Sequence, residues 1–485
     1  MKNFDQIIGK TGEVGFVEEI VHSLVFVSGL PSAHINEIVV FEEGGMGQIL
    51  SVTDTYVEII LLTRDGENEG QIKVGTKVAR TGYDFNIALD DSLLGKIVHS
   101  LDLASDSGSS VHAEPSNILN RNVIDEPLYT GLSLVDLVVP LGKGQRELVI
   151  GDRKTGKTDF LLQTMLTQSK LGTICIYAGV GKKDVETKKV EEFVKSHGME
   201  KTTIIISSRA SDLAGVIFVT PYVAMTVAEY WQKKGKDVLL VLDDLTNHAK
   251  AYREITLLAK RFPGRSSYPG DIFYIHSKLV ERAGKFKTGS ITCLPVAESV
   301  LGDLSGYIQT NLMAMTDGHI FFDTDLANLG RRPAVNPFLS VTRVGYQAQS
   351  PLVRDLSREL NSFLIKIDNL RQLMHFGAEL NESIRQTLDL GDRTFAFFDQ
   401  ATGISTPINV SVIILAALWS GFWKDVDYVR MRVEMSKLAE VYLKDAAFKK
   451  EIDTRVESSP TLSLLMDNLK KDNAFLVKYV RGVNG

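Results

Sequence analysis

ELVIGDRKTGKT, residues 147–158, joins a short apolar run to the pattern G-x-x-x-x-G-K-[ST]. The apolar run predicts a buried strand, and the eight residues after it predict a loop that binds the phosphates of a nucleoside triphosphate. Glycines let such a loop point backbone N–H groups at phosphate oxygens, while Lys157 neutralises the terminal phosphates and the Thr158 hydroxyl ligates Mg²⁺. The predicted phosphate site consists of Gly151, Asp152, Arg153, Lys154, Thr155, Gly156, Lys157 and Thr158.

A second apolar run, residues 238–242, ends in Asp243 and Asp244. A carboxylate at the end of a buried strand can hold Mg²⁺, directly or through water, beside the hydroxyl of Thr158. We therefore predict that Asp243 is the metal-side residue. The alternative is that the two aspartates only begin a helix as its N-cap.

Three kinds of hydrophobic pattern follow one another along the chain. Short β-rich runs with glycine turns predict a small β-barrel at residues 11–80, and amphipathic helical spacing after Pro351 predicts a helical domain that includes a helix opened by Ser459-Pro460. Between them, unbroken apolar runs predict a mainly parallel sheet wrapped by helices, with strands at 147–150, 173–177, 203–206, 238–242, 272–275 and 319–322. The expected domains are residues 1–82, 83–350 and 351–485.

The composition of the chain limits the classes of function and the cellular location that we expect for it. The net charge of −6 gives no overall attraction to nucleic acid or anionic lipid. Cys175 and Cys293 lie in apolar stretches and predict buried, reduced thiols in the cytoplasm. The polar start at residues 1–6 predicts no secretory signal, and the longest apolar stretch, 410–423, predicts a buried helix because it is too short to span a membrane.

Several motifs resemble the alpha subunit of F-type ATP synthases: PLGKGQRELVIGDRKTGKT (140–158), LDDL (242–245), GRSSYPGDIFY (264–274) and LSVTRVGYQAQ (339–349). VSGL (27–30), ARTG (79–82), LLGK (93–96) and EPLYTG (126–131) follow in the order of that family. The resemblance implies a RecA-like P-loop domain that binds ATP or ADP with Mg²⁺. It also implies an alternating hexamer with catalytic beta-type subunits around a central rotating shaft, joined to a membrane or motor complex on the cytoplasmic side through other subunits.

One position decides whether the site hydrolyses nucleotide. In the family's catalytic beta subunit, a glutamate after the strand that follows the P-loop helix polarises the attacking water, and ordinary alpha subunits have glutamine there. Lys182 matches this position, and a protonated lysine cannot accept a proton from water. We therefore expect a non-catalytic site. Two alternatives are that Asp184 or Glu186 acts as a substitute base, and that Lys182 is a solvated surface lysine.

The resemblance also assigns roles to residues near the end of the P-loop domain. Arg343 matches the alpha residue that reaches a neighbouring subunit's terminal phosphate, where a guanidinium can follow the spreading charge; the alternative is a structural arginine paired with a carboxylate. Arg332, Pro333 and Gln400 match the residues that line the adenine end of the pocket.

The chain departs from the family in several places. Lys154 replaces a glutamine of the P-loop, Thr402 replaces a second adenine-side glutamine, and Asp125 replaces an arginine. The family's N-terminal stalk-docking helix has no counterpart before the barrel. We expect a divergent copy of the rotary hexamer that drives a load other than proton transport.

Two other classes of protein use a similar P-loop domain. A self-sufficient hexameric ATPase of the export type would hydrolyse ATP as this chain alone. A terminator-type RNA translocase would need a barrel whose aromatic and basic side chains stack and hold bases. The barrel region instead has scattered aromatic residues among many glutamates, so we expect no nucleic-acid partner.

Overall fold

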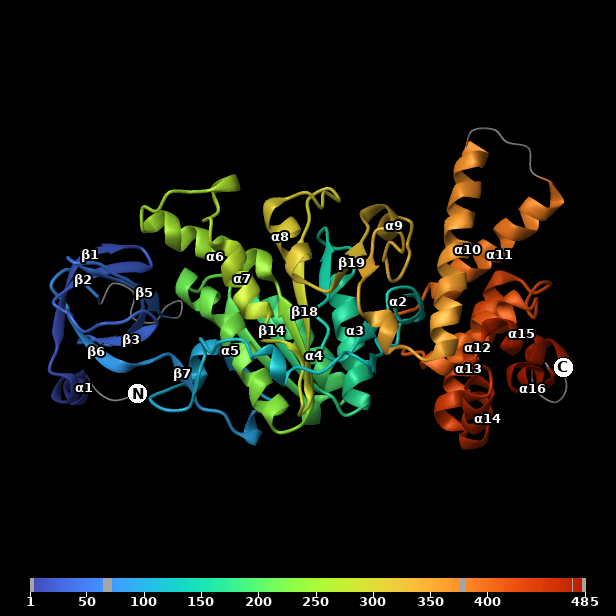
Figure 1. The fold of residues 1–485 in the computed structure, drawn as a ribbon, viewed down its shortest axis with the longest axis horizontal. Helices are drawn as coiled ribbons and strands as arrows, with labels where there is room; N and C mark the ends of the chain where they lie inside the picture. The colour runs from blue at the N-terminus through green and yellow to red at the C-terminus, as the bar shows by residue number, and fades with distance from the viewer. Residues whose placement is uncertain (1–3, 64–71, 376–380, 473, 482–485) are drawn as a thin grey trace. The chain divides into compact units, whose positions relative to one another are not determined.

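The computed structural model of the chain describes residues 4–63, 72–375, 381–472 and 474–481 (Figure 1). Part of the polar N-terminus, Met1–Asn3, lies outside these ranges. The chain forms two compact units from interleaved segments. Unit 1 consists of Met1–Val123, Lys143–Ile150 and Gln168–Asp317, and unit 2 of Ile124–Gly142, Gly151–Thr167 and Gly318–Gly485. The predicted domain boundaries at 82/83 and 350/351 stay predictions.

Unit 1 begins with the predicted barrel, which is confirmed as a closed six-stranded barrel in the order β1-β2-β5-β4-β3-β6 (Figure 1). Its strands are β1 (Val14–Val21), β2 (Leu24–Ser28), β3 (Glu37–Phe41), β4 (Met46–Val52), β5 (Val57–Leu62) and β6 (Lys77–Asp84), preceded by helix α1 (Phe4–Thr11). The sequence pattern missed β4, which contains Gly47. A Cβ at Gly47 would lie 2.4 Å from a side-chain carbon of Ile59, so this strand needs a glycine where it crosses its neighbour.

The remainder of unit 1 contains the predicted parallel sheet. Its strands are β8 (Ile97–His99), β14 (Ile174–Lys182), β15 (Thr203–Arg209), β16 (Asp237–Asp243) and β18 (Ser290–Glu298), in the order β18-β16-β14-β15-β8. All neighbours in this order pair in parallel. The chain leading into β13 (Leu148–Gly151) also pairs in parallel with β18, at Arg146 and Cys293. These strands therefore have their carboxyl ends at one edge.

Helices cover this sheet. Helix α5 (Ala214–Lys233) packs on β14, β15, β16 and β18, while α4 (Asp184–Ser196) and α6 (Leu245–Leu258) also contact its strands. The predicted strand at residues 272–275 is wrong, because these residues begin helix α7 (Ile272–Val280). A short apolar run cannot separate the two structures by itself. Burial follows the helical period, with Ile272, His276, Leu279 and Val280 buried and Phe273 and Tyr274 exposed.

The sequence pattern missed two strands of this sheet, β8 and β18, and Pro295 interrupts the expected pattern of β18. The shorter elements of unit 1 are β7 (Asn86–Ile87), β9 (Ala104–Ser105), β10 (Ser109–Ser110), β17 (Gly284–Lys285) and α8 (Tyr307–Met315). Among the residues that the structure describes, the 3₁₀ helices are Asp91–Leu93, Ser100–Leu103, Ile118–Asn120, Glu200–Thr202, Arg265–Ser267 and Gly345–Ala348. Cys175 and Cys293 are buried, free thiols, as predicted.

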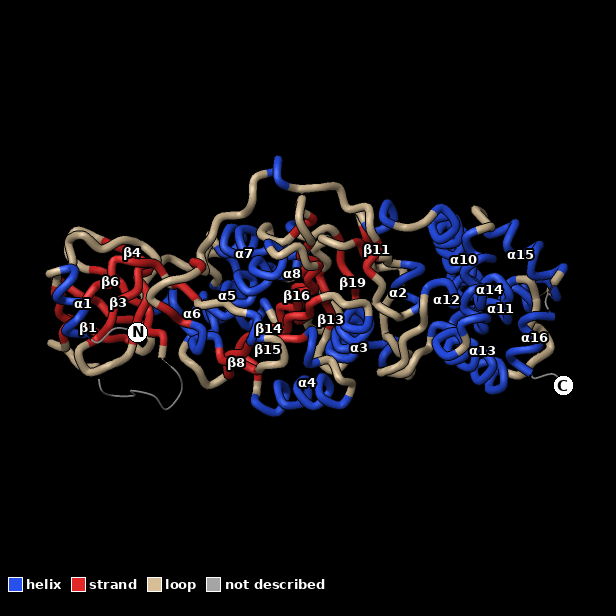
Figure 2. Tube along the Cα trace, turned by 90° about the horizontal axis from the view of Figure 1, so that it is seen from below, coloured by secondary structure: helices blue, strands red, loops and turns tan. Residues whose placement is uncertain are grey.

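Unit 2 ends in helices, which confirms the predicted helical domain (Figure 2). They are α10 (Pro351–His375), α11 (Glu382–Phe398), α12 (Ile408–Trp419), α13 (Tyr428–Lys444), α14 (Ala446–Glu457), α15 (Leu462–Lys471) and α16 (Ala474–Arg481). The predicted helix opening at Ser459-Pro460 is wrong, because Thr461 caps α15 through its side chain. Helix α12 is the predicted buried helix. Within the described ranges, no helix has the length and apolar character needed to cross a membrane.

The other elements of unit 2 precede these helices. They are β11 (Pro127–Leu128), α2 (Ser133–Val138), β12 (Leu141–Gly142), β19 (Gly318–Phe322), α9 (Thr324–Asn328) and β20 (Val341–Thr342). Helix α3 (Lys157–Lys170) follows the phosphate-loop motif directly. The motif itself therefore lies in unit 2, between the end of β13 and the first turn of α3.

Candidate functional site

The motif Gly151–Thr158 adopts a turn whose backbone needs glycine at two places. Gly156 has φ +97°, in the left-handed region that other residues adopt at a cost. A Cβ at Gly151 would lie 2.4 Å from the carbonyl oxygen of Phe322 in β19, so only glycine allows this close approach. The side chain of Lys157 donates to the carbonyl oxygens of Gly151 and Asp152, each at 2.7 Å, and so folds over the loop.

The loop ends at the amino terminus of α3, where backbone N–H groups have no helical partner. Such a terminus attracts phosphate oxygens. Arg153, Lys154 and Lys157 add three positive side chains, and those of Arg153 and Lys154 are exposed. Thr158 is also exposed, in the first turn of the helix. The loop thus combines oriented N–H donors with cations, which is the chemistry that binds polyphosphate.

A cavity of unit 2 brings the loop together with the predicted adenine-side residues. Its lining includes Thr155 and Gly156 of the loop and Arg332, Pro333 and Gln400 from distant parts of the sequence. Five lining residues were not predicted: Leu132, Ala334 and three residues of α3, Asp159, Phe160 and Gln163. The α3 residues lie in the first two turns of the helix after the loop, so a helical projection from Lys157 could have found them.

The side chain of Gln400 is already hydrogen-bonded within unit 2. Its Oε1 accepts a hydrogen bond from the backbone N–H of Ser133 at 2.6 Å, and its Nε2 donates to the Thr406 hydroxyl at 2.8 Å. The amide therefore holds together the segments around the cavity. A base that paired with this amide would have to displace at least one of these contacts.

In unit 1, the end of β16 carries a compact cluster of side chains. The Lys182 ammonium lies 2.7 Å from Oδ1 of Asp243 and 3.7 Å from Oδ2 of Asp244. The Tyr177 hydroxyl donates to Oδ2 of Asp243 at 2.6 Å. Both oxygens of Asp243 therefore have a side-chain partner, and no local sequence pattern predicted the tyrosine.

The backbone of β14 explains why Tyr177 and Lys182 reach the same carboxylate. Gly179 lies opposite Asp243, and Tyr177 precedes it by two residues, on the same face of the strand. Lys182 is three residues further, which would place it on the other face. The pairing with β15 shifts between Gly179 and Lys182, with three steps on β14 against two on β15. This bulge, with Gly181 at φ +58°, turns Lys182 back to the face of Asp243.

Burial and charge set the ionisation of this cluster. Burial opposes the charged form of Lys182, but the carboxylates of Asp243 and Asp244 prevail and raise its pKa above the ordinary value. Burial, followed by the charge of Asp243, raises the pKa of Tyr177 well above its usual range. Burial also raises the pKa of Asp244 to about 6, against the charge of Lys182. Lys182 is thus an ammonium and Tyr177 a neutral donor at neutral pH.

The sequence left two roles open for Asp243 and Asp244, a carboxylate beside Mg²⁺ or a helix N-cap, and the two residues differ in this respect. Asp244 is the N-cap of α6, because its Oδ1 accepts from the backbone N–H of Asn247 at 2.8 Å. Asp243 is the last residue of β16 and caps nothing. The idea that Lys182 is a solvated surface lysine is wrong, since its side chain is only 15% exposed. Asp184 is 63% exposed and lies 3.4 Å from Arg209, at the start of α4, and Glu186 is exposed on the same helix.

The predicted role of Asp243 in holding Mg²⁺ does not fit this arrangement. Magnesium needs oxygen ligands at about 2.0–2.1 Å in near-octahedral geometry. Here one oxygen of Asp243 contacts an ammonium and the other a hydroxyl proton. An ammonium at this place repels a divalent cation. Among the residues that the structure describes, no group of three or more His, Cys, Asp or Glu side chains is arranged to hold a metal ion.

Arg343 lies in unit 2, immediately after β20, and its side chain is exposed. The turn that carries it is tightly fixed. The Thr342 hydroxyl donates to the carbonyl oxygen of Pro140 at 3.0 Å and accepts from the N–H of Gly345 at 3.1 Å. A Cβ at Gly345 would lie 1.7 Å from the same Pro140 oxygen, so this glycine is required. An exposed guanidinium on a fixed turn is suited to contact a group outside the chain.

Comparison with known proteins agrees with this geometry. The nucleotide-binding domain of the ATP synthase alpha/beta family matches residues 131–342, and the C-terminal domain of the ATP synthase alpha/beta chain matches residues 349–471. The ATP synthase subunit alpha of Neorickettsia sennetsu is 36% identical over 447 residues, which cover 88% of this chain and 87% of that protein. The chain belongs to the ATP synthase alpha subunit family.

A second relative supports the same assignment. The ATP synthase subunit alpha of Staphylococcus aureus (strain JH9) is 36% identical over 455 residues, covering 91% of this chain and 90% of that protein. Membership in this family explains why the loop, the cavity and the exposed arginine occur in one chain.

Proposed function

We propose that this chain is a non-catalytic, nucleotide-binding alpha-type subunit of a rotary F-type ATP synthase or ATPase hexamer. It binds ATP or ADP at Gly151–Thr158 and supplies Arg343 to the catalytic site of an adjacent beta-type subunit. The hexamer surrounds a central rotating shaft and contacts the cytoplasmic face of a membrane, or a motor complex, through other subunits. As a divergent copy it drives a load other than proton transport.

The observation that carries the non-catalytic assignment is the ion pair between Lys182 and Asp243, 2.7 Å long. Hydrolysis requires a group that accepts a proton from, or orients, the attacking water. Lys182 occupies the family position for that group, and its ammonium has no lone pair to accept a proton. The exposed Asp184, beside Arg209, is not buried against this cluster.

Nucleotide binding follows from the P-loop and the cavity beside it. The loop N–H groups and Lys157 hold the phosphates, and Arg332 and Pro333 line the base end. Mg²⁺, where it accompanies the nucleotide, would contact the exposed Thr158 hydroxyl, because this oxygen is the remaining predicted ligand. Loss of bound nucleotide from a Lys157→Ala variant, measured on the purified complex, tests this part of the proposal.

The role of Arg343 predicts a large effect on a neighbour's activity. An arginine that stabilises charge on a transferring phosphoryl group contributes about 10³-fold or more to the rate. We expect Arg343→Ala to lower ATP hydrolysis by the complex about 10³-fold while this chain still binds nucleotide. Arg354→Ala is the matched control, because Arg354 is also exposed and lies on α10. Equal activity of the two variants would contradict the role in trans.

Native purification distinguishes the proposal from its alternatives. A co-purifying beta-type chain with its own P-loop and catalytic glutamate supports the alternating hexamer. Strong hydrolysis by this chain alone, abolished by Lys157→Ala, would instead support a self-sufficient ATPase of the export type. Salt-dependent RNA binding by the full chain would support a terminator-type translocase.

A further inference from the structure

We propose that a second cavity of unit 2 is a binding site for a small aromatic carboxylate. This cavity, the Phe395 cavity, has a volume of about 230 Å³. Its lining includes residues of the segment 326–338, Asp368 and Arg371 of α10, and Phe395 of α11. The inference goes beyond the proposed nucleotide binding, because this ligand is not a nucleotide and does not contact the phosphate loop.

The size of the Phe395 cavity fits a single substituted ring. An apolar cavity of about 150 Å³ is enough to bind benzene, whereas sites for drug-sized ligands have about 300–1,000 Å³. The Phe395 cavity lies between these values. The expected ligand is therefore one aromatic ring with one or two small substituents.

Much of the wall of the cavity is apolar. Leu134, Val335 and Phe398 are buried and line its inner part. Leu329 and Phe338 also line it, and their large apolar side chains remain exposed. Walls of this kind hold the apolar body of a ligand, while a few polar groups fix its orientation.

The ring of Phe395 carries guanidinium groups from two segments of the chain. The guanidinium carbon of Arg371 lies 4.9 Å from the ring centroid, and that of Arg331 lies 5.3 Å from it. A guanidinium stacks on an aromatic face through its own plane, so the N–H donors at its edge stay available. A flat ligand can extend this stack, and its carboxylate can accept two parallel hydrogen bonds from one guanidinium. The geometry thus favours a ligand that is both planar and anionic.

The charges that line the cavity favour a monoanion. Its lining contains three guanidiniums, those of Arg331, Arg332 and Arg371, and two carboxylates, those of Asp368 and Asp399. The lining therefore has one positive charge in excess, which one carboxylate neutralises. A triphosphate would instead bring several negative charges close to two aspartates, which opposes its binding here.

Arg331 is the guanidinium that can pair with this carboxylate. Arg371 is already paired with Asp392, and Asp399 lies 3.1 Å from Arg432. In the part of the chain that the structure describes, the half-buried Arg331 has no carboxylate partner. An anionic ligand would supply that partner, and hydrogen bonds between charged groups are stronger than those between neutral groups.

The Phe395 cavity is distinct from the cavity beside the phosphate loop. Arg332 and Pro333 line both cavities, but Thr155 and Gly156 of the loop line only the other one. The backbone N–H of Arg332 donates to Oδ1 of Asp399 at 3.0 Å and so fixes the shared segment. An aromatic carboxylate can therefore bind without displacing a nucleotide from the loop.

The test compares two fluorinated probes of the same shape. The anion is para-(trifluoromethyl)benzoate, and para-(trifluoromethyl)benzamide is its neutral counterpart. Fluorine NMR measures the dissociation constant of each probe for the full chain purified under native conditions. We expect the benzoate to bind at least about tenfold more tightly, because hydrogen bonds to a charged group are stronger. Equal affinity for the two probes, or no saturable binding of the benzoate, would overturn the inference, and this comparison does not depend on the folding of any variant.

Three variants locate the bound benzoate. Arg331→Gln should weaken its binding at least about tenfold, because the charged donor is lost. Phe395→Leu should weaken it about threefold, because the ring that orients the guanidiniums is lost. Arg354→Gln is the matched control, since Arg354 is an exposed arginine of α10 outside the lining of the cavity, and it should leave the affinity unchanged. Equal affinities of Arg331→Gln and Arg354→Gln for the benzoate would contradict the assigned site.

Lys157→Ala separates failure of this inference from failure of the proposed function. Lys157 belongs to the phosphate loop, so its replacement should leave benzoate binding unchanged. Loss of benzoate binding in this variant would place the probe at the nucleotide site and overturn the inference. A chain that binds the benzoate but no ATP would instead overturn the proposed nucleotide binding and leave this site in place.

Discussion

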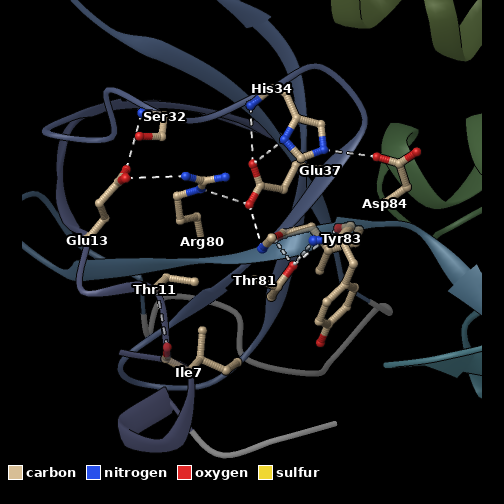
Figure 3. A network of polar contacts seen from close by, with 12 residues as sticks. Ile7, Thr11, Glu13, Ser32, His34, Glu37, Arg80, Thr81, Tyr83 and Asp84 are labelled. Atoms are coloured by element: carbon tan, nitrogen blue, oxygen red, sulfur yellow. Dashed lines mark hydrogen bonds and ion pairs between the residues drawn. The ribbon is translucent and has the colours of Figure 1, made fainter. Parts of the chain in front are cut away.

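Two of the clusters in unit 1 in which a cation meets a carboxylate, one in the barrel and one at the end of β16, differ in what holds the carboxylate. In the barrel, Glu37 is fully buried and accepts hydrogen bonds from Nε of Arg80 at 3.0 Å and from the backbone N–H of Gly82 at 2.7 Å (Figure 3). The backbone N–H and the ring of His34 contact its other oxygen. Asp243, at the end of β16, has only the side chains of Tyr177 and Lys182 among its contacts in the described part of the chain.

This difference separates a structural cluster from one that can vary. Backbone donors persist whatever side chains are present, so the barrel fixes Glu37 in place and Arg80 adds to an existing site. The Asp243 cluster exists only through two replaceable side chains. A substitution there changes the charge at the strand end while the strand keeps its backbone hydrogen bonds. The second cluster is therefore the one whose charge a single side-chain substitution can change.

The largest expected effect of breaking either cluster is in the barrel. Arg80→Met leaves buried Glu37 without its guanidinium partner and should lower the free energy of unfolding by about 3 kcal/mol. Urea denaturation measures the loss, and hydrogen exchange of the barrel strands locates it. Lys77→Met is the control, because the Lys77–Glu42 pair is about half exposed and should contribute less than about 1 kcal/mol. Similar losses in the two variants would contradict a special role for burial.

At the strand end, Tyr177→Phe should destabilise the fold by about 2 kcal/mol. It removes the hydroxyl that donates to Oδ2 of Asp243 and leaves that buried oxygen without this donor. Tyr252→Phe is matched to it, since the Tyr252 hydroxyl donates to Asp271 at 2.7 Å but this carboxylate is exposed and can bond to water instead. Thermal unfolding measures the loss of stability in both variants. A loss for Tyr252→Phe as large as that for Tyr177→Phe would show that burial of the carboxylate is unimportant.

A buried pair without any charge provides a third case. Nδ1 of His248 lies 3.0 Å from Nε2 of His276, and burial lowers the pKa of His248 to about 3 and that of His276 well below its ordinary value. Folding depresses both pKa values. The contribution of the two neutral imidazoles to the free energy of unfolding is therefore present above about pH 6.5 and is lost as the pH falls. As the pH falls from 7.5 to 5, we expect each histidine to lower the free energy of unfolding by at most about 2 kcal/mol.

The pH dependence is checked by urea denaturation at several pH values. His276→Gln should reduce the slope of stability against pH below 6.5, because glutamine does not titrate. His22→Gln is the control for the substitution itself, because the side chain of His22 is 62% exposed. A steeper slope for His276→Gln would contradict the assignment of a neutral buried pair.

The contrast between the clusters also explains what the sequence could predict. The P-loop, the parallel strands and the helical domain follow from local patterns, and the run at 238–242 correctly predicted a strand that ends at an aspartate. The bulge that turns Lys182 toward Asp243 depends on the register with β15, which is a tertiary property. The helix at Ile272–Val280 was missed because four apolar residues fit either period. The barrel cluster joins Glu37 to Arg80 across 43 residues, a pairing that no local pattern contains.

The smallest expected effect comes from Asp244, and it separates capping from charge at the strand end. Asp244→Asn keeps a side-chain oxygen that can accept from the N–H of Asn247, and asparagine is as good an N-cap as aspartate. Its Oδ2 lies 3.7 Å from Lys182, further than Asp243, so the lost charge weakens the ion pair only slightly. We expect a change within about 0.5 kcal/mol, measured by thermal unfolding. Asp244→Ala, which removes the cap as well, should cost about 1 kcal/mol. If Asp244→Asn instead destabilised the fold as strongly as Asp244→Ala, the charge of Asp244 would be the main contribution, and the ion pair of Lys182 would be shared between both aspartates rather than centred on Asp243.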